Sequence, residues 1–420
     1  MIIEQVRVID PAQNLDEVRD LYIADGKITD TPPVGTKVID GRGLVAAPGF
    51  IDLHVHLRDP GLTHKEDILT GTMAAAAGGF TSVACMPNTK PALDTPEQLA
   101  YVIDKAHHAS ARVLPIAAVT VGQAGETLTD FKALRDAGAI GFSDDGFAVD
   151  SAALLRQAML EAAALDMPLI SHCEDTEMVQ NHAVNEGVIS KRLKIPGRPA
   201  VAETIQVARD LLLAEDAGCH VHIAHVSVAK SVELIRRAKA DGVRVTAETC
   251  PQYFTLTEDA LLEKGTLARV NPPLRTEADR DAIMAGLLDG TIDTIVTDHA
   301  PHSVEEKARP LLEAPSGMIG LETLLGLSLT ALYHTDKMDL PAIVRLLSTT
   351  PAEIFSLPYG TLRVGAPADV MIFDPEETWT VEPEMFHSKA RNTPFGGMEL
   401  KGRVRYTICD GVLRYGRSVW

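Results

Sequence analysis

The sequence predicts an α/β protein: a closed (β/α)8 TIM-type barrel accompanied by a small β domain. Within residues 46–359, eight short apolar runs alternate with stretches of helical periodicity, and βα-like units in this number are typical of a closed parallel barrel. The chain of 420 residues is longer than a typical barrel and leaves room for an accessory domain. An open, doubly wound parallel sheet is the structural alternative.

The two ends of the chain share a different pattern. Short alternating segments at 5–9 and 21–23 are typical of antiparallel strands. We therefore expect residues 1–45 and 360–420 to form one small β-sandwich-like domain together, and residues 46–359 to form the barrel. The C-terminal strands expected in the small domain are 368–373, 378–381, 402–409 and 411–413.

In the barrel, each apolar run is expected to be a buried strand, and a helix follows most of them. The uncharged stretch 68–89 could suggest a membrane span, but Gly78-Gly79 and Pro87 interrupt it, so helix, turn and strand are expected. The predicted strands are 53–57, 82–86, 113–119, 140–143, 169–172, 221–226, 243–247 and 294–297, and the clearest predicted helices are 96–109, 152–165, 202–214 and 229–239.

Charge and cysteine content exclude several classes of protein. The formal net charge is −19, from 39 basic and 58 acidic residues, so no surplus of cations is present to bind nucleic acid. The five cysteines include no C-x-x-C pair, and the N-terminal segment 1–4 lacks the features of a signal peptide. We expect a cytoplasmic protein that binds neither nucleic acid nor membrane. An anionic ligand would need a local positive site.

Two histidines one residue apart, His54 and His56, end the first barrel run. Residues i and i+2 of a strand project from the same face, so both imidazoles can reach one point in space. An isolated pair of this kind is more often an ordinary feature of a half-exposed strand. The turn signals Pro48-Gly49 before it and Pro60-Gly61 after it place this pair at the carboxyl end of a strand, which is the catalytic edge of a barrel.

Polar residues also follow four further predicted strands at their carboxyl ends. Taken singly, a histidine that ends a strand is usually structural, and Asp-Asp-Gly is usually a turn. Together these residues would converge on one barrel mouth, and histidine and aspartate are suitable ligands for zinc or a similar divalent ion. The spacing alone leaves open which of two adjacent aspartates is the ligand. The residues are Asp144 and Asp145, His172, His225 and Asp298.

Longer motifs make the chain similar to the dihydroorotases, in their long bacterial form, within the amidohydrolase superfamily. They span most of the predicted barrel, and together they are highly specific. The motifs are DLHVHLR at 52–58, MPNT at 86–89, TCPQY at 249–253, NPPLR at 271–275, TDHAPH at 297–302 and GMIGLET at 317–323.

The resemblance implies a binuclear metal site that holds one or two Zn²⁺ ions. One metal would be bound by His54, His56, Asp145 and Asp298, and the second by Asp145, His172 and His225. Asp145 is preferred to Asp144 because it matches the family position directly before Gly146. It would stand where related cyclic amidases have a carboxylated lysine.

The resemblance also implies the reaction, a reversible cyclisation of N-carbamoyl-L-aspartate to L-dihydroorotate in pyrimidine biosynthesis. Asp298 would move the proton between the attacking water and the leaving nitrogen. Arg58 lies two residues beyond His56 and can bind a carboxylate with two hydrogen bonds. Further substrate contacts are expected from Asn88, Asn271, His302, Ser316 and Gly317.

One segment departs from the family pattern. The family has Pro-Phe-Gly before Met318, whereas this chain has Pro315-Ser316-Gly317, so an apolar contact to the substrate is lost while the backbone contacts remain available. Residues 300–316 are either a mobile loop over the barrel mouth or a plain surface connection.

Two rival functions remain, one of them a related enzyme activity and the other a non-catalytic role. Hydantoinases, dihydropyrimidinases and allantoinases share the His-x-His strand, but they expect a lysine after the fourth strand, where this chain has none. A non-catalytic dihydroorotase-like scaffold for aspartate transcarbamoylase would have lost metal ligands. We also expect a homo-oligomer, most simply a dimer, with a complex with aspartate transcarbamoylase as a further expectation.

Overall fold

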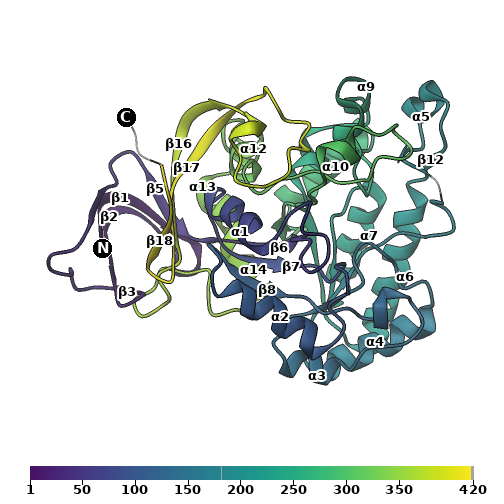
Figure 1. The fold of residues 1–420 in the computed structure, drawn as a ribbon, viewed down its shortest axis with the longest axis horizontal. Coiled ribbons are helices and arrows are strands. Elements are labelled where there is room, and N and C mark those ends of the chain that lie inside the picture. Colours follow the sequence, from purple (N-terminus) through teal and green to yellow (C-terminus); the bar gives the residue numbers. More distant parts are fainter. Residues whose placement is uncertain (181, 418–420) are drawn as a thin grey trace.

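The computed structural model describes residues 1–180 and 182–417. Figure 1 shows two parts: a β-rich part in which the purple and yellow ends of the chain lie side by side, and a larger part with helices on its outside. The pairing of the strands in the larger part closes them into a ring. The site described below lies at one end of that ring, so its geometry depends on how the ring closes.

The ring is a closed barrel of eight parallel strands. Three strands form one ladder and five form another. Parallel bridges between Ala117 and Phe142 and between Val55 and His299 join the two ladders at both seams. The predicted barrel is therefore confirmed, and the open sheet is excluded. Its strands are β6 (Phe50–Val55), β7 (Phe80–Cys85), β8 (Arg112–Pro115), β9 (Phe142–Ser143), β10 (Leu169–Ser171), β13 (Val221–Ile223), β14 (Val245–Thr249) and β15 (Thr294–Ile295).

The outer helices begin where the sequence supplies capping residues. Thr95, Ser151 and Thr276 each accept a backbone N–H of the first turn that follows, and Gly218 ends α6 in a left-handed conformation. No helix of the described residues is long and apolar enough to span a membrane. The outer helices of the barrel are α1 (Ile68–Ala77), α2 (Pro96–Ala106), α3 (Phe131–Asp136), α4 (Ala152–Ala164), α6 (Val201–Ala217), α7 (Ala229–Ala240) and α10 (Glu277–Leu288).

Short elements occupy the loops and the segment that leads out of the barrel. The short helices are α5 (Val188–Leu193), α8 (Pro251–Thr255), α9 (Ala260–Lys264), α11 (Val304–Lys307), α12 (Leu324–Ser328), α13 (Leu340–Val344) and α14 (Thr350–Ile354), and the short strands β11 (Val184–Asn185) and β12 (Gly197–Arg198) pair with each other.

Both ends of the chain contribute to a single mixed sheet of eight strands, with the order β18-β17-β16-β5-β1-β2-β3 and β4 paired to β1. The pairing of β5 with β16 joins the two chain ends, and β5 continues beyond residue 45 to Pro48. The strands are β1 (Ile2–Asp10), β2 (Leu15–Ala24), β3 (Lys27–Thr29), β4 (Val38–Asp40), β5 (Val45–Pro48), β16 (Val370–Thr380), β17 (Glu399–Cys409) and β18 (Val412–Gly416).

Alternate residues of this sheet face two different cores. On β16, Met371 and Phe373 pack into the large core of the barrel, whereas Val370 and Ile372 pack into a separate core within the small domain. This is the two-residue alternation expected of a strand that is buried on both faces. The small domain is therefore anchored to the barrel by the apolar side chains of one face of its sheet.

A partly buried guanidinium strengthens that contact. Arg112 of β8 lies 2.9 Å from Asp369 and 2.6 Å from Asp410, and its guanidinium stacks on the Tyr359 ring at 4.0 Å. Its side chain is 16% exposed, so its removal leaves the nearly buried Asp369 carboxylate without its cation.

We expect Arg112→Met to lower the free energy of unfolding by about 2 kcal/mol or more, because one partner of a largely buried ion pair is lost. Urea denaturation followed by circular dichroism measures the change. Arg7→Met is the matched control, because the Arg7–Asp16 pair is much more exposed and surface pairs contribute little. Equal destabilisation by the two substitutions would contradict this assignment.

Candidate metal centre

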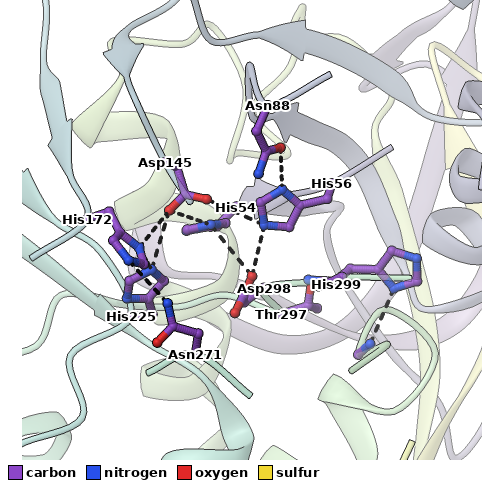
Figure 2. Close-up of polar contacts among 12 residues, drawn as sticks. His54, His56, Asn88, Asp145, His172, His225, Asn271, Thr297, Asp298 and His299 are labelled. Carbon is purple, nitrogen blue, oxygen red and sulfur yellow. Dashed lines mark hydrogen bonds and ion pairs between the residues drawn. The ribbon is translucent and has the colours of Figure 1, made fainter. Parts of the chain in front are cut away.

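Five barrel strands direct polar side chains to one end of the barrel (Figure 2). His54 lies on β6 and His56 directly after it, and Asp145, His172, His225 and Asp298 follow β9, β10, β13 and β15. The carboxyl ends of parallel strands meet at the same rim, so residues that are far apart in the sequence converge there. All six side chains predicted as metal ligands are buried, and the structure brings them into one cluster.

Asp145 occupies the middle of this cluster. Its Oδ1 lies 3.4 Å from His54 Nε2, 3.3 Å from His172 Nδ1 and 3.4 Å from His225 Nε2, while its Oδ2 lies 3.5 Å from His56 Nε2. The ligand atoms form two groups, His54–His56–Asp145 and Asp145–His172–His225, each within 4.8 Å. Asp145 belongs to both groups, as a carboxylate shared by two metals would.

The electrostatics of the cluster suit a cation. His54 Nε2 and Asp145 Oδ1 are both buried and have no hydrogen-bond partner in the part of the chain that the structure describes, which is unusual for buried polar atoms. Although burial alone would raise the pKa of Asp145, the facing histidines hold it well below its usual range. An ionised carboxylate among imidazole nitrogens is a donor set that fits a divalent metal ion.

Asp298 completes the first group. Its Oδ1 lies 3.1 Å from His56 Nε2 and 3.7 Å from His54 Nε2. Its Oδ2 has no hydrogen-bond partner among the residues that the structure describes. Asp298 and His225 have φ values of +48° and +33°, a region that non-glycine residues rarely adopt and that is often found at functional sites.

The structure shows which of the two adjacent aspartates faces the histidines, a choice that sequence spacing left open. Asp144 turns away from the cluster and accepts hydrogen bonds from the backbone N–H of Val119, at 2.8 Å, and of Thr120, at 3.1 Å. The Thr120 hydroxyl donates to its other oxygen. Asp144 therefore organises the chain that follows β8, and Asp145 faces the histidines.

Glu248 on β14 is a residue of this site that the sequence analysis missed. Its Oε1 lies 2.6 Å from His54 Nδ1 and accepts the backbone N–H of His225 at 3.3 Å, and its Oε2 lies 3.0 Å from His222 Nε2. A carboxylate on Nδ1 leaves Nε2 of His54 available as a metal ligand. The signal that could have identified it is a glutamate inside an otherwise buried strand.

Two residues predicted to contact the substrate also contact histidines of the cluster. Asn88 Oδ1 lies 2.8 Å from His56 Nδ1, and Asn271 Nδ2 lies 3.4 Å from His172 Nε2. Glu174, which was not predicted, has Oε2 at 3.6 Å from the same His172 nitrogen. Polar contacts of this kind orient metal-binding imidazoles, and the hydrogen bonds among them set the tautomers.

The cluster opens into a cavity of about 430 Å³. Arg58 is the cation that faces it: the side chain is buried, Nε donates to Pro301 O at 3.2 Å, and no carboxylate among the described residues lies within 4 Å. Burial lowers the pKa of Arg58 to about 10, so it remains charged at neutral pH. All six residues predicted to contact substrate line this cavity: Arg58, Asn88, Asn271, His302, Ser316 and Gly317.

Other polar residues near the motifs lie outside the cluster. The His299 ring points away from it in Figure 2, with Nε2 3.5 Å from Glu66 and Nδ1 accepting the Gly320 N–H at 3.3 Å. The Cys173 thiol is buried beside Asp210 at 3.6 Å. Both residues are structural.

Comparisons with known proteins agree with this geometry. A family model described as dihydro-orotase-like matches residues 43–231, and one described as amidohydrolase family matches residues 197–415. A dihydroorotase of Citrifermentans bemidjiense is 49% identical over 421 residues, and one of Clostridioides difficile is 47% identical over 420 residues; each alignment covers 99% of this chain and 99% of the relative.

Solved structures share the whole fold. An L-hydantoinase (dihydropyrimidinase) from Arthrobacter aurescens superposes with a TM-score of 0.88 at 27% identity, covering 100% of this chain and 97% of that one. A dihydropyrimidinase from Brevibacillus agri gives 0.85 at 25% identity, covering 98% and 94%. With full-length relatives at nearly half identity, this chain belongs to the dihydroorotase family of the amidohydrolase superfamily.

Proposed function

We propose that this chain is a zinc-dependent dihydroorotase, which interconverts N-carbamoyl-L-aspartate and L-dihydroorotate in pyrimidine biosynthesis. The single observation that carries the proposal is the buried Arg58, which faces the same cavity as the Asp145 cluster and has no carboxylate partner among the described residues. A cyclic amide that bears a carboxylate is a substrate that uses both features.

The residues suited to holding zinc fall into two sets that share Asp145. His54, His56, Asp145 and Asp298 would hold one ion, and Asp145, His172 and His225 a second. The orphaned His54 Nε2 and the central carboxylate support this arrangement. When bound, such an ion lowers the pKa of a water molecule to about 7 and polarises a carbonyl group.

The side chains around the cavity would bind substrate and move its proton. Arg58 would hold the substrate carboxylate with two parallel hydrogen bonds, which orients the ring amide toward the histidine cluster. In the hydrolytic direction, Asp298 takes a proton from the attacking water through its unpartnered Oδ2 and delivers it to the amide nitrogen as the C–N bond breaks. In the direction of cyclisation the same carboxylate removes that proton.

Two rivals are weaker. The hydantoinase structures share the fold at 25–27% identity, whereas the dihydroorotases reach 47–49%, and an arginine in the cavity suits a substrate that bears a carboxylate. A non-catalytic scaffold has no use for a complete set of buried ligand side chains. The expected homodimer, the complex with aspartate transcarbamoylase and the cytoplasmic location stay predictions, and size-exclusion chromatography tests the first two.

We expect the zinc-loaded protein to turn over L-dihydroorotate and N-carbamoyl-L-aspartate, with kcat/KM for hydantoin and allantoin at least about a hundredfold lower, because those substrates leave Arg58 unpaired. A spectrophotometric assay of the purified protein with each substrate tests this. Chelation should abolish turnover, and added zinc should restore it. Absence of turnover with both dihydroorotate and carbamoyl-aspartate would refute the proposed function.

The adjacent aspartates offer a matched test of the metal site. Asp145→Asn should lose bound metal, because it removes the only negative charge shared by both ligand groups. Asp144→Asn should retain metal while losing about 1–2 kcal/mol of stability, since it disturbs a buried hydrogen-bonded carboxylate. Mass spectrometry of metal content after dialysis, with thermal melts, separates the two outcomes. Retention of metal by Asp145→Asn would contradict the assignment.

Arg58→Met should lower kcat/KM for N-carbamoyl-L-aspartate by about a hundredfold or more, because a buried charge pair with the substrate is lost. The kcat/KM of Arg58→Lys should lie between the values of Arg58→Met and the wild type, because lysine retains the charge but cannot form the two parallel hydrogen bonds. Arg156→Met, at an exposed site on α4, controls for the loss of an arginine. Unchanged kinetics in Arg58→Met would remove this residue from substrate binding.

A further inference from the structure

The segment 300–317 contributes to the lining of the cavity, and three consecutive carbonyl groups in it accept hydrogen bonds from side chains of the protein. The Pro315 and Gly317 carbonyls both accept hydrogen bonds from the Lys307 ammonium at 3.0 Å, and the Ser316 carbonyl accepts from His302 Nε2 at 2.8 Å. The Ser316 N–H has no partner among the described residues. This stretch of backbone, which lines the cavity, therefore keeps one donor that no described residue uses.

Lys307 is an unusual residue for the interior of a protein. It ends the one-turn helix α11, only 4% of its surface is exposed, and no carboxylate among the described residues lies within 4 Å of its ammonium. Its third hydrogen bond is to the Arg269 carbonyl at 3.3 Å. Burial, and then the nearby Arg269 guanidinium, lower its pKa to about 7. A buried lysine is costly, so its interior position needs a reason beyond packing.

Asn392 is a second side chain that hydrogen-bonds the same backbone. Its Nδ2 donates to Ala300 O at 3.0 Å and to Gly317 O at 3.1 Å, and its Oδ1 accepts the His302 N–H at 3.1 Å. The side chain is buried, and both of its polar atoms are used. Asn392 lies between β16 and β17, so this contact comes from the C-terminal part of the chain.

Gly317 is thereby held at every polar atom of its backbone. Its carbonyl has the two donors described above, and its N–H donates to Arg269 O at 2.9 Å. Its φ is +133°, and a Cβ would lie 2.7 Å from the Ala300 Cβ, so only glycine fits. Lys307 and Asn392 therefore hold this stretch of backbone by hydrogen bonds, together with His302 and the Arg269 carbonyl.

We propose that Lys307 and Asn392 are positioning residues that fix the 315–317 backbone against the cavity, and that substrate affinity depends on them. The proposal rests on the proposed function for its choice of ligand. Neither side chain hydrogen-bonds a predicted metal ligand, so their loss should weaken substrate binding and leave the chemical step nearly intact.

Lys307→Met keeps the length of the side chain and removes its charge and donors. We expect KM for N-carbamoyl-L-aspartate to rise about tenfold or more, with kcat changed by less than about threefold and metal content unchanged. Asn392→Asp is isosteric and replaces the donor to the Ala300 and Gly317 carbonyls with an oxygen. We therefore expect the same result, a rise in KM with kcat nearly unchanged. Lys230→Met on α7 and Asn14→Asp, both at exposed positions, are the matched controls.

The pH dependence of KM gives a second test, because Lys307 can lose its charge near neutral pH. Above pH 7 the neutral amine has two N–H groups for three carbonyls, so KM of the wild type should rise between pH 6 and pH 8.5. Of the groups around it, burial lowers the pKa of His302 to about 2, Arg269 stays charged, and Glu306 is paired with Lys65. Lys307→Arg keeps its charge, so its KM should not follow this rise. Identical pH profiles in the two proteins would contradict the proposal.

Hydrogen–deuterium exchange of residues 300–317 without substrate tests the same idea independently of activity. Exchange in this segment should increase in Lys307→Met and Asn392→Asp and stay unchanged in the two controls. If the wild type is active and both variants keep its KM and its exchange, the inference is wrong and the proposed function stands. If the wild type turns over neither substrate, the proposed function fails, while the exchange experiment still decides whether these side chains hold the segment.

Discussion

The interaction on which the rest of the site depends is the contact of one carboxylate, Asp145, with four imidazoles inside a closed barrel. It is unfavourable to bury four histidine rings with their nitrogen atoms turned toward one common point, unless an ion occupies that point. Asp145 supplies the anion, and its distances of 3.3–3.5 Å to all four rings are longer than good hydrogen bonds. Its Oδ1 therefore stays without a hydrogen-bond partner among the described residues, as an oxygen available to a metal ion would. The barrel makes this possible because it brings the ends of separate strands to one rim.

The nitrogen atoms that face away from Asp145 are held as well. Glu248 and Asn88 accept from the Nδ1 atoms of the His-x-His pair, and Glu248 also accepts the His225 backbone N–H. One glutamate thus links a histidine of each metal group. Since orienting contacts of this kind strengthen metal binding by tenfold or more in typical sites, the strength of the centre is distributed over side chains that never touch the metal.

Much of this arrangement could be predicted from sequence because barrel geometry converts strand ends into neighbours. The eight strands appear as apolar runs, and the two-residue period identifies His54 and His56 as same-face neighbours. The choice between Asp144 and Asp145 could not be made from spacing, since both follow the end of a strand and only the turn decides which side chain points inward. Glu248 was missed because a partner of a ligand has no motif of its own. The roles of the site residues remain predictions until variants are measured.

The same reasoning explains how related enzymes with one fold can select different substrates. The hydantoinase structures superpose on this chain with TM-scores of 0.85–0.88, so the barrel and the small domain alone do not choose the ring that is bound. Under the proposed function, that choice would fall to the residues that line the cavity beside the histidines, where Arg58 supplies a cation and residues 315–317 supply backbone groups. Part of that lining is held by Asn392, which lies in the C-terminal region. The C-terminal part of the chain therefore does more than cover the barrel: it reaches into the lining of the cavity where the substrate would bind.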